Sequence, residues 1–145
     1  MEETNFSQDF LTFLASTNES EVEKLYTFAM DSLMFSIKVH YYHFACESGF
    51  QHTHFEELYT IIRDFADKLV ETVMSMGIKF KIESKTYMLN DEIFDLNSAL
   101  LKIENFRDEL VKLKEQYSTK ISLENLFGDT IENIDKEIGL IKNFK

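Results

Sequence analysis

The sequence predicts an all-α fold, a four-helix bundle in which a long connection joins the second and third helices. The 145 residues include no Pro and only four Gly, so few positions interrupt a helix. Apolar residues recur at three- and four-residue steps through most of the chain. With 44% hydrophobic and 28% charged residues, the chain is suited to one folded domain over residues 1–145, with residues 1–19 as an N-terminal extension.

The first long helix is predicted to start near residue 21, because Ser20 and Glu23 fit a capping box. It should run to about Glu47, and its apolar residues cover more than one face, which predicts a second buried surface. Before it, the spacing of aromatic and aliphatic residues predicts a short amphipathic helix over Asn5–Ala15.

The second helix is predicted over residues 50–76. Ser48 and Gly49 interrupt the apolar pattern before it, and Gly77 is suited to ending it. Residues 78–89 then lose the helical period, so we expect an extended connection or a short strand there.

The third helix is predicted to begin at a cap formed by Asn90 or Asp91 and to end near Tyr117. Its predicted core face consists of Ile93, Leu96, Leu100, Ile103, Phe106, Leu110 and Leu113. The last helix is predicted within residues 122–143, where Gly128 either divides it or lies inside it.

Charge and cysteine content limit the partners. A net charge of -11 disfavours direct nucleic-acid binding, which relies on Lys and Arg, and favours attraction of cations. Cys46 is the only cysteine, which excludes an intramolecular disulfide and favours a reducing cytoplasm. No segment resembles a signal peptide or a membrane span, so we expect a soluble cytoplasmic protein. The lack of Pro with abundant Asn, Lys, Ile and Phe suits a low-GC bacterium or its phage.

Two histidines and two carboxylates form the candidate site. His52 follows His40 by twelve residues, Asp67 comes fifteen residues later, and Glu71 follows one helical turn after that. Imidazole and carboxylate ligands together suit Fe(II) or another borderline divalent metal. On a helical projection the carboxylates point away from the apolar stripe of their helix, which also fits a plain solvated face.

This order and spacing resembles the ferroxidase signature of the Dps branch of the ferritin-like family. The sequence FEELY at Phe55–Tyr59 stands where such proteins carry a similar stretch. The resemblance implies a ferritin-like bundle with one long crossover between its second and third helices, where the helical pattern breaks here. It further implies Fe(II) oxidation, with hydrogen peroxide as the expected oxidant, and storage of the ferric product without an organic cofactor.

The resemblance also implies that the site lies between subunits of a homo-oligomer built from dimers, twelve chains in the family. His40 and His52 of one chain would face Asp67 and Glu71 of its two-fold partner. Glu71 would be the bridging or principal iron ligand and Asp67 would complete the carboxylate pair. His40 would be a direct ligand, and His52 a second ligand or a holder of water.

Several neighbours of the site have two interpretations or depart from the family. Tyr41 stands where many Dps-like chains have Trp, and is either an interface aromatic or an electron source. His43 is either a packed or surface histidine or a support for the site, while His54 is expected at the surface. The chain has no Trp, Thr72 replaces the usual Arg, and a lysine-rich DNA-binding tail is absent.

A different class of function fits the same sequence. A ferritin-like fold also suits a non-catalytic acidic scaffold that binds a protein partner, because fold alone does not decide function. The missing Trp and Thr72 favour the scaffold, whereas the spacing of the two histidines and two carboxylates favours the ferroxidase. No Glu-x-x-His pair, phosphate-binding loop or zinc-protease motif is found.

Overall fold

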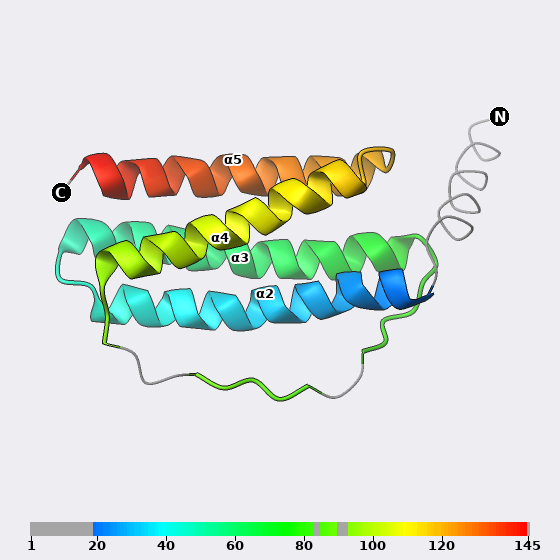
Figure 1. Cartoon of the computed structure of the whole chain (residues 1–145), viewed down its shortest axis with the longest axis horizontal. Helices are drawn as coiled ribbons and strands as arrows, with labels where there is room; N and C mark the ends of the chain where they lie inside the picture. The colour runs from blue at the N-terminus through cyan, green and yellow to red at the C-terminus, as the bar shows by residue number, and fades with distance from the viewer. Residues whose placement is uncertain (1–18, 83–84, 90–92, 145) are drawn as a thin grey trace.

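The computed structural model describes residues 19–82, 85–89 and 93–144, with side chains from residue 21 onward. Over these residues the chain forms four helices and no strand: α2 (Glu19–Ala45), α3 (Gly49–Ser75), α4 (Leu96–Gln116) and α5 (Ile121–Asn143). Figure 1 shows them along one long axis, with α2 and α3 forming one hairpin and α4 and α5 another. The all-α four-helix prediction is therefore confirmed for this part of the chain, and the helix predicted over Asn5–Ala15 lies outside it.

The ends of α2 and α3 lie close to their predicted positions. α2 already includes Glu19, so Ser20 lies inside the helix rather than at its cap. Ser48 caps α3 with extended backbone, and its side-chain oxygen accepts a hydrogen bond from the backbone N of Gln51 at 3.1 Å. Gly77 follows α3 with φ of 88°, a left-handed conformation that glycine adopts without strain, which confirms the predicted stop.

The predicted start of the third helix is wrong. Asp95 caps α4, and its side chain accepts a hydrogen bond from the backbone N of Ser98 at 2.9 Å. Hydrogen bonds with the side chain and the backbone of Ser98 lower the pKa of the Asp95 carboxyl. Ile93, which we expected on the core face, is 97% exposed because it precedes the cap and belongs to the connection. Asn90 and Asp91 lie outside the described residues.

α5 is continuous through Gly128, so this glycine does not divide the helix. A Cβ atom built at Gly128 would lie 3.1 Å from Cε of Lys114 on α4. The missing side chain therefore leaves room for the aliphatic part of the Lys114 side chain. A glycine inside a helix costs about 1 kcal/mol relative to alanine, and the buried Phe127 beside it helps to offset that cost.

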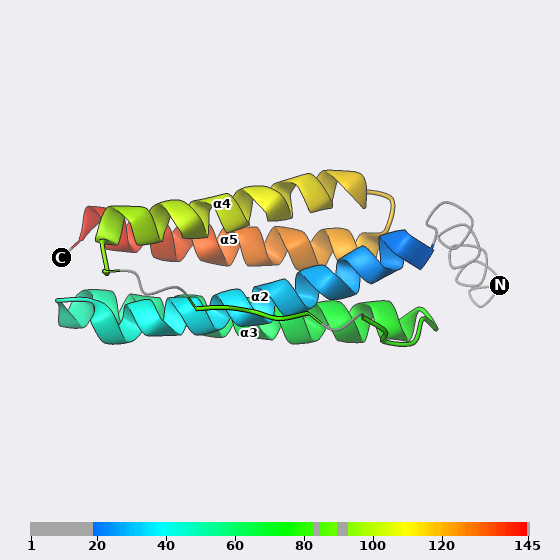
Figure 2. The same ribbon diagram turned by 60° about the horizontal axis from the view of Figure 1, so that its bottom comes forward.

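The core lies between the two hairpins, which Figure 2 shows as two layers. At its centre the Phe65 ring of α3 lies about equally far from three others, with centroid distances of 6.0 Å to Phe28 of α2, 6.2 Å to Phe106 of α4 and 6.0 Å to Phe127 of α5. One aromatic ring from each helix thus meets at this point. The largest fully buried side chains are Tyr26, Phe55, Phe65, Phe127, Leu25, Leu58, Ile62, Leu69, Ile103, Leu110 and Leu123.

The connection between α3 and α4 contacts α2 at three levels, and its described parts contain no strand. From the N-terminal to the C-terminal end of α2, the contacts pair Tyr26 with Ile78, Asp31 with Lys85 and Tyr87, and Tyr42 with Phe94. Figure 1 shows the connection passing along the hairpin. Burial and the Asp31 carboxylate raise the pKa of Tyr87 to about 12. Among the described helices, none has the length and apolar content to cross a membrane.

Candidate functional site

His40 lies near the C-terminal end of α2 and is held between two aromatic rings. Its imidazole stacks on Tyr59 of α3 with a centroid distance of 4.0 Å and an interplanar angle of 14°. It also stacks on Phe44, one turn later on α2, at 4.7 Å. These contacts leave His40 half-buried on the α2–α3 hairpin. A ring fixed in this way has little rotational freedom to lose when it binds a ligand.

His52 forms a reciprocal pair with His43 across the turn between α2 and α3. Nδ1 of His43 lies 2.7 Å from the carbonyl oxygen of His52, and Nδ1 of His52 lies 2.9 Å from the carbonyl oxygen of His43. The two rings stack at 3.6 Å. His43 is buried and His52 is exposed. Of the roles considered for His43, a surface position is therefore wrong, and the packed position is confirmed.

Cys46 lies beside this pair. Its Sγ contacts the carbonyl oxygen of His43 at 3.3 Å, in the last turn of α2. Burial raises the pKa of the Cys46 thiol. A thiol with a raised pKa is less reactive near neutral pH, because the thiolate is the nucleophilic form.

Asp67 and Glu71 are exposed on α3, on the side away from its buried residues, as the helical projection predicts. At a rise of 1.5 Å per residue, Asp67 lies about 22 Å along the helix from His52, and Glu71 about 28 Å. A metal ion bound within about 2–3 Å of each ligand cannot span these distances. His52 and the two carboxylates of one chain therefore cannot share an ion. Consistent with this, the described residues contain no group of three or more His, Cys, Asp or Glu placed to hold a metal within the chain.

An exposed apolar row accompanies these residues on α2. Ile37, Tyr41 and Phe44 are 43%, 46% and 71% exposed, and their spacing of four and three residues puts them on one face. We call these three residues the α2 stripe. It belongs to the second apolar surface that the sequence predicts for this helix, and among the described residues it stays largely exposed.

His54 does not lie free at the surface, and that expectation is wrong. Its Nδ1 lies 2.5 Å from Oε2 of Glu137 on α5, and the two side chains are 17% and 9% exposed. The pair therefore ties α3 to α5 near the end of the bundle. The sequence carried a signal for it: Glu137 follows Ile134 by three residues and precedes Ile141 by four, on the apolar face of its helix.

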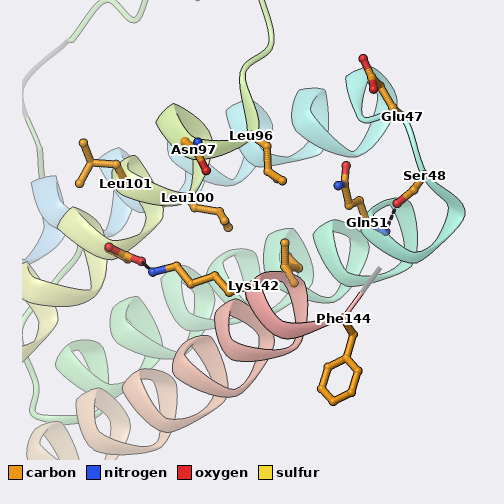
Figure 3. A pocket seen from close by; sticks show the side chains of 11 residues that line it. Glu47, Ser48, Gln51, Leu96, Asn97, Leu100, Leu101, Lys142 and Phe144 are labelled. Atoms are coloured by element: carbon orange, nitrogen blue, oxygen red, sulfur yellow. Dashed lines mark hydrogen bonds and ion pairs between the residues drawn. The ribbon is translucent and has the colours of Figure 1, made fainter.

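An open cavity of about 750 Å³ lies at the same end of the bundle. Figure 3 shows its walls, which come from the α2–α3 turn, the start of α4 and the end of α5. Leu96 and Leu100 contribute apolar surface, and an ion pair of Lys142 with Glu104 lies on its edge. None of the four predicted site residues lines this cavity.

Comparison of the chain with protein-family models, with curated proteins and with solved structures finds no significant match.

Proposed function

We propose that this protein is a Dps-like ferroxidase, which oxidises Fe(II) at sites formed between two copies of the chain and stores the product. The observation that carries the proposal is the position of the four signature residues on the α2–α3 hairpin. His52, Asp67 and Glu71 are exposed and His40 is half-buried, so none of them belongs to the core of its own bundle. His52 lies too far along α3 from Asp67 and Glu71 for these residues of one chain to bind the same ion. An intersubunit site requires such a separation.

A two-fold axis would complete the site. An axis crossing α3 between Thr60 and Ile61 places His52 of one chain at the level of Asp67 and Glu71 of an antiparallel partner. His40 contacts the ring of His43, which stacks on His52, so His40 lies near His52 on the hairpin. Two equivalent sites would then form in each dimer, each with imidazoles from one chain and carboxylates from the other.

The α2 stripe supports this arrangement. Its Ile37 precedes His40 by less than one turn, so the stripe lies beside the proposed axis rather than at a distance from it. Interfaces between identical chains bury apolar surface at their centre. The same contact that covers the stripe would therefore bring the ligands of the two chains together.

We also infer that residues 76–95 form the ferritin-like crossover. A bundle of this family needs one connection that returns along its length, whereas an up-and-down bundle needs only short loops. The contacts of this connection with Tyr26, Asp31 and Tyr42, in order along α2, support the inference.

The proposed chemistry uses iron as the substrate. Neutral imidazole binds Fe(II), and the carboxylates favour Fe(III) as it forms because they are hard anionic donors. With hydrogen peroxide as oxidant, two Fe(II) give up two electrons, and peroxide takes these with two protons to form two waters. The net charge of -11 per chain favours the approach of the cation.

Iron oxidation by a Glu71→Gln variant tests the proposal. Anaerobic Fe(II) is mixed with the protein, stoichiometric peroxide is added, and ferric absorbance is followed. Glutamine keeps the size of the side chain but removes its charge, so oxidation should fall to the rate in buffer while the fold persists. Glu132→Gln is the matched control, because Glu132 is exposed on α5 and should leave the rate unchanged. Wild-type protein no faster than buffer would instead favour the non-catalytic scaffold.

A further inference from the structure

The contacts between His43 and His52 determine which nitrogen of His52 is able to bind a metal. A carbonyl oxygen only accepts hydrogen bonds, so the 2.9 Å contact with the carbonyl of His43 requires a proton on Nδ1 of His52. A neutral imidazole carries one N–H, and Nε2 of His52 therefore keeps its lone pair. Metal-binding histidines commonly donate one ring N–H to a carbonyl or carboxylate and bind the metal through the other nitrogen.

His43 restrains the same ring from its face. The two rings stack at 3.6 Å with an angle of 29°, and His43 donates its own Nδ1–H to the carbonyl of His52 at 2.7 Å. His43 is only 7% exposed, so a buried residue holds an exposed one. α2 ends at Ala45, and the last carbonyls of a helix lack partners within the helix. The carbonyl of His43 can therefore accept the hydrogen bond from His52 beside its contact with Cys46 Sγ.

We infer that His43 is a positioning residue: it does not bind the metal, but it holds the ring of His52 in the tautomer that offers Nε2 as the ligand atom. The metal-binding part of this inference rests on the proposed function, which makes His52 a ligand. Loss of such a supporting contact typically weakens metal affinity by about 10- to 100-fold. The sequence resemblance does not include His43, so this role is a property of this chain's own geometry.

The tautomer is measured first, without any metal. Two-bond proton–nitrogen correlation spectra of 15N-labelled apoprotein at pH 8 distinguish an imidazole protonated at Nδ1 from one protonated at Nε2. We expect the Nδ1–H tautomer for both His43 and His52 in wild type. His43→Ala keeps the backbone carbonyl that accepts the hydrogen bond but removes the ring that holds His52 against it. His52 should then leave this carbonyl part of the time and populate both tautomers.

Binding of Co(II) alone, a divalent probe that avoids iron oxidation, is measured next on the full chain. His43→Ala should bind about 10- to 100-fold more weakly than wild type, whereas His43→Phe keeps an aromatic ring against His52 and should recover most of the affinity. In a His52→Ala background, His43→Ala should add no further loss, because it acts through His52. Leu123→Ala, which truncates a fully buried residue at the N-terminal end of α5, controls for general destabilisation and should leave the affinity unchanged.

The outcomes separate the two proposals. An Nε2–H tautomer for His52 in wild type overturns the positioning role, and so does a His43→Ala variant that binds Co(II) as tightly as wild type. Co(II) affinity that is equally weak in His43→Ala and His43→Phe also overturns it, because the ring against His52 would then make no contribution to the affinity. Wild-type protein that binds no Co(II) overturns the proposed function and the metal-binding role together, and it is recognised because every variant then behaves alike.

Discussion

In the proposed dimer, replacing Ile37 with lysine should separate the two copies of the chain without unfolding them. Fully burying an isoleucine side chain stabilises by about 1.5–3 kcal/mol. Ile37 is 43% exposed in the single chain, so covering the rest contributes about 1 kcal/mol per copy. Ile37 occurs twice in a two-fold contact, once from each chain, so the two residues together stabilise the dimer by about 2 kcal/mol. Losing this energy raises the dimer dissociation constant about 30-fold. Two lysines near the axis would also repel, so the loss in Ile37→Lys should be at least this large.

Sedimentation equilibrium over a range of protein concentrations measures the dissociation constant, and circular dichroism checks that each variant remains folded. Val111→Lys is the matched control, because Val111 is β-branched, 37% exposed and lies on α4 in the other hairpin. It should leave the dissociation constant unchanged. Iron oxidation by Ile37→Lys should be slow in dilute solution and recover at concentrations that restore the dimer. A wild-type chain that stays monomeric, or an Ile37→Lys constant equal to wild type, would refute the reasoning.

Three further predictions concern stability. Ser48→Ala removes the cap of α3 and should lower the free energy of unfolding by about 1 kcal/mol, measured by urea denaturation. Burial, with the nearby Glu21 carboxylate, raises the pKa of Tyr117 to about 12. Its contribution to stability is therefore complete below pH 10 and should be lost as pH rises toward 12, and a Tyr117→Phe variant should show a smaller loss in the same denaturation series. Glu137→Ala removes the hydrogen-bond partner of the half-buried His54 and should lower the free energy of unfolding by about 1–3 kcal/mol. Thermal melts of Glu109→Ala, which breaks an exposed pair, should match wild type.

Local signals were sufficient to predict a helix end where the backbone there favours one particular residue type. Gly77 ends α3 because its positive φ suits glycine, and Ser48 begins the helix because its side chain satisfies a free backbone N–H. The repeat of apolar residues was enough to identify all four described helices, since a helix of this kind must bury one face.

Local signals were insufficient at the start of the third helix, where several residues close together are suitable caps. Asn90 or Asp91 was predicted as the cap, and Asp95 is a residue of the same capping type. The cap lies at Asp95, so Ile93 belongs to the connection although its spacing fits the core face. In the sequence, the helical spacing of apolar residues continues N-terminally past the first residue of α4. Ile93 fits this spacing, but it lies outside the helix and so does not face the core.

The sequence by itself determined the helices, the outward direction of Asp67 and Glu71, and the residue types that suit iron, because each depends on spacing along one helix or on ligand chemistry. Only the tertiary structure decided that His43 stacks on His52 and that His54 reaches Glu137. These pairs join different helices, and their distances depend on how the helices cross and pack. That packing is set by the whole core, so no short stretch of sequence contains it.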